Sequence, residues 1–180
     1  MVRHETVPSL AEVAPSLARR ARRRTETVDE ILRIAVDVMR EEGAAALSLS
    51  EVARRIGVRP PSLYKYFPSR AAVYDALFRR GAEQVLDRFR TAAAAAEPGV
   101  EALAAGVEAF GRWGAENGAL AQLLFWRPVP GFVPSAEAYG PAVDLVSDIE
   151  KQLASAVERG QLRAEARELL HRPPLAVAQQ

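Results

Sequence analysis

The five residues from Ser62 to Tyr66 carry a hydroxyl, an amine and two phenols. All four groups donate hydrogen bonds, and the sequence has no carboxylate between Ile56 and Tyr74 that would repel an anion. Phosphate oxygens and the edges of nucleic-acid bases are the partners that such a surface suits. The stretch is therefore a candidate for contact with nucleic acid.

The residues that must position these groups, Leu47 to Arg70, are predicted to form a helix, a tight turn, a second helix and the start of a third. Ser48 is a candidate N-cap, and Glu51 stands where a capping box places its carboxylate. Gly57 ends the first helix because glycine tolerates the left-handed conformation. Two prolines open the second helix, expected over about 60–67. This layout is typical of a DNA-binding helix-turn-helix, although an ordinary pair of short helices in an all-α core has the same spacing.

Two runs in this stretch, from Ala53 to Val58 and from Leu63 to Arg70, resemble the DNA-binding signature of the TetR family of bacterial transcriptional regulators. The resemblance covers about residues 25–78. Three positions depart from the usual pattern, because Arg59 replaces a small hydroxyl residue, Tyr66 a histidine and Arg70 a lysine. The last two keep a hydrogen-bond donor for phosphate, whereas Arg59 could change which bases are read.

The resemblance implies that two copies place their second helices in successive major grooves of duplex DNA, about 34 Å apart. The expected DNA-contacting residues are Arg24, Thr25, Ser48, Ser50, Arg59, Pro60, Ser62, Tyr64, Lys65, Tyr66 and Arg70. Tyr64, Lys65, Tyr66 and Arg70 would hold phosphates. Base edges or thymine methyl groups would be touched by Arg59, Pro60 and Ser62. The two earlier serines would bond a phosphate at a helix N-terminus. Arg24 and Thr25 would touch the backbone from the start of the first helix.

The composition favours an all-α protein, because alanine and leucine are abundant and no strand-like alternation persists along the 180 residues. The formal net charge is only +1, but residues 19–90 carry +6 and residues 91–180 carry −4. Only the front half is therefore expected to meet nucleic acid. There is no cysteine, no apolar run near the ~20 residues that span a bilayer, and no apolar signal segment at the start. We expect a cytoplasmic protein without a cofactor and without a membrane partner.

The expected organisation has four parts. These are a flexible basic arm over 1–24, a helix-turn-helix domain over 25–70, a helical ligand-binding and dimerisation domain over 71–160, and a short tail over 161–180. The arm ends in five arginines between residues 19 and 24. A solvated charge run explains them, but their place directly before the DNA-binding domain favours contact with phosphates or the minor groove.

Apolar residues at helical spacing predict helices over about 25–42, 69–95, 100–116, 119–126 and 137–159, the last starting at Glu137 or Pro141. The apolar side expected of the helix over 100–116 holds Val100, Leu103, Ala104, Val107, Phe110 and Trp113. The inner face expected of the last helix holds Val143, Val146, Ile149, Leu153 and Val157.

Six aromatic residues cluster in the second half of the chain, and they are Phe110, Trp113, Phe125, Trp126, Phe132 and Tyr139. Core packing explains any one of them, but together they flank a proline-broken loop and suggest an apolar cavity. The segment from Phe110 to Phe132 also loosely resembles the C-terminal domain of the WHG-type TetR subgroup. That resemblance implies a pocket for an unknown small apolar effector.

The end of the chain departs from the family, whose members usually finish with two long helices that pair with their copies in a four-helix dimer interface. Only 20 residues follow Gly160. A short helix over Ala164–His171 is expected, ended by two prolines. The short tail leaves open how a dimer forms.

An enzyme is not expected, because no phosphate-binding glycine loop, metal-ligand cluster or catalytic motif occurs. The sequence predicts a DNA-binding transcriptional regulator, a ligand-responsive repressor that binds a palindromic operator as a homodimer. The alternative is a helical interaction module of the same fold that lost specific operator binding through its short C-terminus. Specific DNA binding and a dimer mass favour the regulator.

Overall fold

The computed structural model describes residues 10–163, with side chains from residue 18 onward, and this range is entirely helical apart from its connections. The helices are α1 (Leu10–Glu42), a 3-10 turn η1 (Ala44–Ala46), α2 (Leu49–Ile56), α3 (Pro61–Tyr64), α4 (Arg70–Ala94), α5 (Val100–Glu116), α6 (Gly118–Phe125) and α7 (Ala136–Glu158). The all-α prediction is confirmed. A search of the described helices finds none with the length and apolar character to cross a bilayer.

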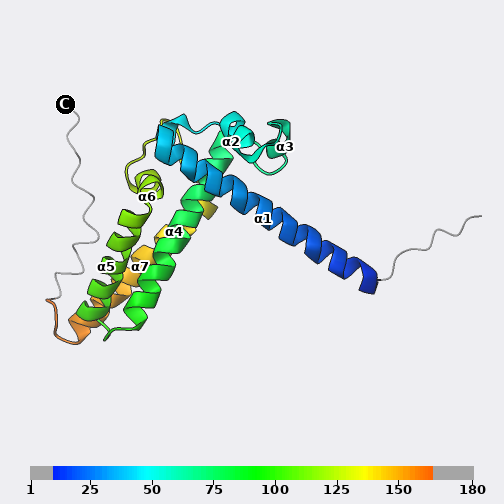
Figure 1. Cartoon of the computed structure of the whole chain (residues 1–180). Helices are drawn as coiled ribbons and strands as arrows, with labels where there is room; N and C mark the ends of the chain where they lie inside the picture. The colour runs from blue at the N-terminus through cyan, green and yellow to red at the C-terminus, as the bar shows by residue number, and fades with distance from the viewer. Residues whose placement is uncertain (1–9, 164–180) are drawn as a thin grey trace, which may run out of the picture.

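The molecule has two parts joined by α4 (Figure 1). The second half of α1, η1, α2 and α3 gather around the first turns of α4. Further along, α4 packs against α5 and α7, and the short α6 sits between α5 and the helix-turn-helix end. The first half of α1 projects away from both parts (Figure 1).

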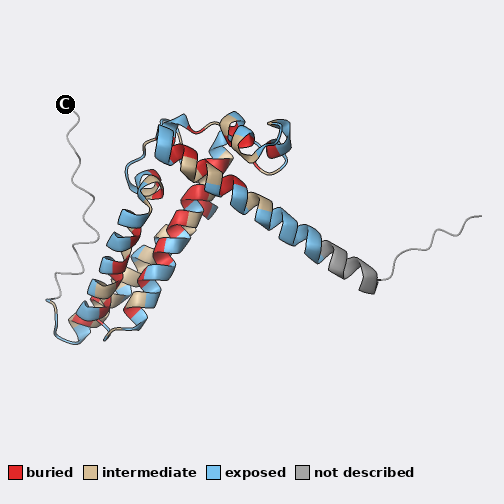
Figure 2. Cartoon of the chain, viewed as in Figure 1, coloured by how far each residue is buried: buried red, intermediate tan, exposed pale blue. Residues whose placement is uncertain are grey.

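Helix α1 begins at Leu10, so the prediction of a helix start at Thr25 and of a flexible arm over 1–24 is wrong for residues 10–24. Alanine, arginine and glutamate are good helix formers, and Arg22 pairs with Glu26 one turn later at 2.8 Å. The arginine run therefore stands on an exposed helix (Figure 2). Residues 1–9 lie outside the described range.

The core of the first part lies between α1 and the helix-turn-helix. The stripe on α1 is buried at Ile31, Leu32, Ala35, Val38 and Met39. It meets Leu49 and Val52 of α2, together with Leu63 and Phe67 around α3. Helix α1 thus supports the helix-turn-helix from behind.

In the second part, the buried face of α5 is narrower than predicted. It holds Ala102, Gly106, Ala109 and Trp113, whereas Val107 is 49% exposed. A Cβ on Gly106 would lie 2.5 Å from the Phe89 ring, so this glycine lets α4 and α5 approach closely. The small residues make the contact, and the larger ones of the predicted stripe are pushed to its edge.

Helix α7 shows the same shift. It buries Ala138, Leu153 and Ala156, and it leaves Val143 56% and Val146 49% exposed. The predicted inner face is therefore wrong for both valines. The ends of the other helices after α1 lie close to those predicted from the sequence, except for α3. This helix has four residues where about eight were expected. The predicted helix over Ala164–His171 lies outside the described residues.

Candidate nucleic-acid interface

The turn between α2 and α3 has the predicted glycine geometry. Gly57 is left-handed, with φ 78° and ψ 27°, and it follows directly on Ile56 at the end of α2. Pro60 stands at the N-cap of α3, and Leu63 fixes α3 from inside, since it is 2% exposed and its carbonyl accepts hydrogen bonds from the N–H groups of Tyr66 and Phe67. The outward residues around it include Arg59, Ser62, Tyr64 and Lys65. The structure thus presents the donor groups that the sequence singled out.

A hollow of about 430 Å³ lies where the N-termini of α2 and α4 meet. Four predicted DNA-contacting residues line it, and they are Ser48, Ser50, Tyr64 and Arg70. Helix N-termini carry partial positive charge and unpaired N–H groups, so two of them facing one hollow favour an anion. The hollow has the chemistry of a phosphate seat.

Ser48 does not make the predicted capping box. Its side chain forms no capping hydrogen bond, and the Glu51 carboxylate turns to Arg54 and Arg55, at 2.7 Å from each. Ser48 lines the hollow without making a capping hydrogen bond. Ser69, by contrast, caps α4 by accepting a hydrogen bond from the Ala72 N–H at 3.2 Å.

An ion network that the sequence did not predict ties α2 to the end of α1. The guanidinium of Arg55 reaches Glu41 at 2.8 Å, Glu42 at 3.0 Å and Glu51 at 2.7 Å. Hydrogen bonds from Arg54 and Arg55 lower the pKa of Glu51 to about 2. The adjacent glutamates at the end of α1 and the paired arginines on α2 were the available signal. The network fixes the direction in which α2 leaves α1.

Tyr74 provides a second anchor, inside the core. Its hydroxyl donates to the Ala44 carbonyl at 2.6 Å, and burial raises the pKa of this phenol. The side chain of Arg70 lies 5.9 Å from the Tyr74 ring centre and 3.5 Å from the Ala45 carbonyl. The first turn of α4 is thereby fixed against η1.

Tyr66 has a different position from the other predicted contacts. It is half-buried between α3 and α1, with the Arg24 guanidinium 5.3 Å and the Lys65 ammonium 4.9 Å from its ring centre. A hydrogen bond with Thr27 is the main reason that the pKa of Tyr66 is lowered, and the charges of Lys65 and Arg24 act in the same direction. Tyr66 therefore links α1 to α3 and keeps Arg24 beside the interface.

Arg24 and Thr25 were expected at the start of the first helix, and this placement is wrong, since α1 starts at Leu10. Thr25 instead lies inside the helix. Its hydroxyl donates to the Ala21 carbonyl at 3.2 Å within the helix.

Among residues 18–163, Arg59, Lys65 and Arg70 form no ion pair, whereas Arg54, Arg55 and several arginines of α4 do. The cations at α3 and at the start of α4 are thus not neutralised by carboxylates within this range, and binding to a polyanion requires such cations.

The six aromatic residues do not surround one cavity. Trp113 is fully buried and donates to Gln84 at 3.0 Å, while Trp126 is 75% exposed. Phe110 packs edge-on against Phe125, with ring centres 5.3 Å apart. The remaining two, Phe132 and Tyr139, line a hollow of only about 110 Å³.

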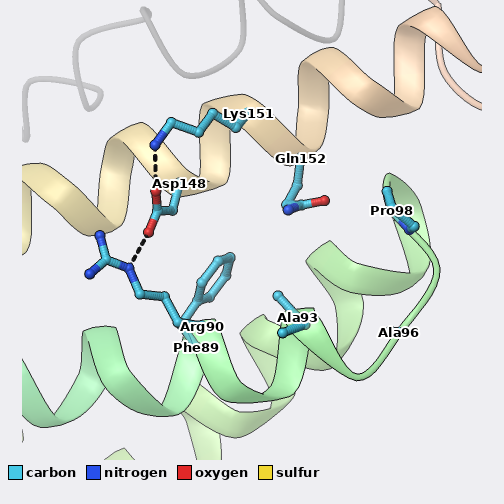
Figure 3. Close-up of a pocket in the computed structure, with 9 residues that line it drawn as sticks. Phe89, Arg90, Ala93, Ala96, Pro98, Asp148, Lys151 and Gln152 are labelled. Atoms are coloured by element: carbon cyan, nitrogen blue, oxygen red, sulfur yellow. Dashed lines mark hydrogen bonds and ion pairs between the residues drawn. The ribbon is translucent and has the colours of Figure 1, made fainter.

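A larger hollow, of about 410 Å³, lies at the far end of α4, against α7 (Figure 3). Phe89 and Ala93 line its α4 side, and Asp148 on its α7 side bonds Arg90 at 2.6 Å and Lys151 at 2.8 Å. Burial opposes the ionisation of Asp148, but these two hydrogen bonds prevail and lower its pKa.

No group of three acidic, histidine or cysteine side chains that could hold a metal occurs within the described part of the chain.

The fold and the interface define a class of protein, an all-helical chain with an N-terminal helix-turn-helix and a helical second domain. Residues 31–77 match the family model for bacterial regulatory proteins of the tetR family. The predicted resemblance to TetR-family transcriptional regulators is thereby confirmed for the helix-turn-helix region, which the family model matches.

Solved structures share the arrangement over most of the chain. The structure named "putative regulatory protein SCO4313" has a TM-score of 0.68 and 28% identity, over 80% of this chain and 72% of that one. The TetR family transcriptional regulator PfmR from Thermus thermophilus has a TM-score of 0.60 and 23% identity, over 77% and 76%. The latter likeness shows the fold alone.

The curated relatives match a third of the chain. Nucleoid occlusion factor SlmA from two strains of Aliivibrio fischeri is 33% identical over 61 residues, which are 33% of this chain. The match spans 31% of the length of those relatives.

Proposed function

We propose that the chain is a repressor that binds a palindromic operator as a homodimer and releases it when an effector binds. The observation that carries the proposal is the hollow where Ser48, Ser50, Tyr64 and Arg70 meet at two helix N-termini. Three hydroxyl groups, a guanidinium and two positive helix ends suit a single DNA phosphate. With that phosphate seated, α3 lies against the groove beside it.

Base reading falls to the residues at the start of α3. Arg59 and Ser62 are exposed there, and Arg59 has no carboxylate partner among residues 18–163. An unpaired arginine can bond the O6 and N7 atoms of guanine in the major groove. Arg59 is thus the residue of this face best suited to distinguish one operator from another.

The projecting half of α1 supplies further phosphate contacts. Arg24 stands beside Tyr66 and α3, and Arg20 lies one turn earlier on the same side of the helix. Both are exposed. Because these contacts involve charge alone, they raise affinity for any DNA rather than for one sequence.

For the effector, we infer that the hollow at the far end of α4 is better suited than the aromatic cluster. It has about 410 Å³ against 110 Å³. Its lining combines Phe89 and Ala93 with the cations Arg90 and Lys151. An effector with an apolar part and an anionic group would bury the apolar part against α4. The anionic group would compete with Asp148 for Arg90 and Lys151. This would loosen α7 from α4.

The test of the DNA-binding proposal is a fluorescence-anisotropy titration with DNA from the upstream region of the gene that encodes the chain. Random DNA of the same length is the control, and the salt concentration is varied. Selective binding that survives physiological salt is expected of a regulator. Weak binding to both DNAs that disappears as salt rises would instead favour an interaction module that uses only the basic helix.

A further inference from the structure

One carboxylate of α4 holds the first turn of α7. Asp75, half-buried in the second turn of α4, accepts hydrogen bonds from the Ser135 N–H at 2.7 Å and from the Ser135 hydroxyl at 2.8 Å. The same hydroxyl oxygen accepts a hydrogen bond from the Ala138 N–H at 3.1 Å, so Ser135 is also the N-cap of α7. A carboxylate at a helix N-terminus is favoured by the partial positive charge there. The two bonds to Asp75 are charge-assisted, and such bonds are about twice as strong as those between neutral groups.

Three further contacts join the same two stretches of the chain. The pairs are Phe132 with Tyr74, Glu137 with Arg79, and Tyr139 with Phe78. The ring centres of the two aromatic pairs lie 5.4 and 5.8 Å apart, and the charged atoms of the ion pair lie 2.5 Å apart. Residues 132–139, which belong to the second domain, thus lie along residues 74–79 of α4.

This stretch of α4 lies directly behind the candidate interface. Arg70, which lines the phosphate hollow, precedes Asp75 by about 7.5 Å along the helix. Tyr74, next to Asp75 in the chain, donates to the Ala44 carbonyl of η1. None of residues 132–139 lines the hollow. Any influence of Ser135 on DNA binding must therefore pass through α4.

In the proposed dimer, the direction of α4 sets the spacing of the two α3 helices. Helix α4 has 25 residues and is about 37 Å long. A change of about 5° in its direction moves one end by about 3 Å relative to the other. This displacement is close to the ~3.4 Å between successive base pairs. A small tilt of α4 is therefore enough to move one α3 out of register with its half-site while the other is seated.

We propose that Asp75 is a positioning residue for operator binding. Through Ser135 it holds α4 in the direction at which both α3 helices of a dimer reach their half-sites. The proposal rests on the operator-binding homodimer proposed above and extends its regulation, because an effector that loosens α7 from α4 pulls on this contact. Loss of the contact therefore acts as the effector does: it weakens binding to the full operator and leaves binding to a single half-site unchanged.

The experiment is an anisotropy titration of the full chain with the upstream site and with one half of that site. Asp75→Asn and Ser135→Ala should each bind the full site about tenfold more weakly, the change expected when a hydrogen bond to a charged group is lost. Their affinity for the half-site should equal that of the wild type. The salt dependence should stay the same on both DNAs, because no phosphate contact is removed. Combining the two substitutions should weaken binding no further, since both remove the same contact.

Two variants serve as controls. Ser135→Thr keeps the hydroxyl and the N-cap, and it should bind both DNAs as the wild type does. Asp87→Asn makes the same chemical change as Asp75→Asn at an exposed position further along α4, and it should leave both affinities unchanged.

Equal weakening on the full site and the half-site overturns the proposal, because Asp75 then supports only the fold of the DNA-binding part. Unchanged or tighter binding of the full site overturns it as well. Circular dichroism checks the fold, and Ser135→Ala gives the result if Asp75→Asn does not fold. A wild type that does not prefer the upstream DNA to random DNA removes the operator, and this inference with it. A selective wild type with insensitive variants removes this inference alone.

Discussion

Replacing Arg70 by glutamine tests the phosphate seat most directly. The side chain is exposed, lines the hollow between α2 and α4, and has no carboxylate partner within residues 18–163. Its contacts inside the chain are weak, at 3.5 Å from the Ala45 carbonyl and 5.9 Å from the Tyr74 ring. The fold is therefore expected to lose about 0.5 kcal/mol or less.

The magnitude follows from counterion release. Each phosphate contact contributes about 0.9 to the slope of log affinity against log salt. A dimer loses two contacts, so the slope should become shallower by roughly 1.8. Between about 50 and 200 mM salt, the affinity of the wild type should then fall about tenfold more than that of the variant.

The assay is a salt series of anisotropy titrations with the upstream DNA. Arg112→Gln is the control, because Arg112 lies on α5 and pairs with Glu108 at 3.4 Å, away from the interface. Its slope should equal that of the wild type. An unchanged slope for Arg70→Gln, with the fold intact by circular dichroism, would falsify the assignment of this residue to phosphate.

Three further predictions concern the scaffold. Tyr74→Phe should lower the free energy of unfolding by roughly 1–3 kcal/mol in urea titrations, because the buried Ala44 carbonyl loses its donor; an unchanged value would mean that this bond is replaced. The pKa of Glu51 in the folded state is lowered to about 2 from 4.5. The stabilisation that its carboxylate gives to the folded state is therefore present above the unfolded-state pKa and is lost as the pH falls toward 2. The urea midpoint of the wild type should thus drop more from about pH 5 to pH 3 than that of Glu51→Gln, and parallel drops would contradict the network. Gly106→Ala should destabilise by roughly 1–3 kcal/mol in thermal melts, because its Cβ would meet the Phe89 ring at 2.5 Å; a gain in stability would show that the ring moves aside freely.

The helix-turn-helix could be predicted because its signals are local. Gly57 ends α2 in the left-handed conformation, and Ser69 caps α4, both from residue type alone. Ser48 differs, since the Glu51 carboxylate has two arginines within reach and bonds them instead of the backbone. A choice among charged partners depends on where the side chains lie, which spacing does not specify.

The packing of the second domain could not be predicted from hydrophobicity. A stripe of large apolar residues on α5 suggests a buried face, yet close approach to α4 selects the small residues Ala102, Gly106 and Ala109. Which of two adjacent apolar sides turns inward depends on helix–helix distance. The start of α1 is not visible in the apolar pattern either, because the arginine run carries no such pattern although its residue types favour a helix.

Helix α4 also separates charge. Its first turns lie beside α3 in the part of the chain, residues 19–90, that carries a net charge of +6. Its last turns, about 37 Å away at 1.5 Å per residue over 25 residues, lie beside α5 and α7, which belong to the part, residues 91–180, that carries −4. The protein is therefore an electric dipole with its positive pole at the helix-turn-helix end. The electric field of a polyanion orients such a molecule while it diffuses toward the polyanion. More of the diffusional encounters therefore occur with the positively charged end facing the polyanion. The same polarity repels the rear of the molecule from DNA, and association should slow as ions screen both poles.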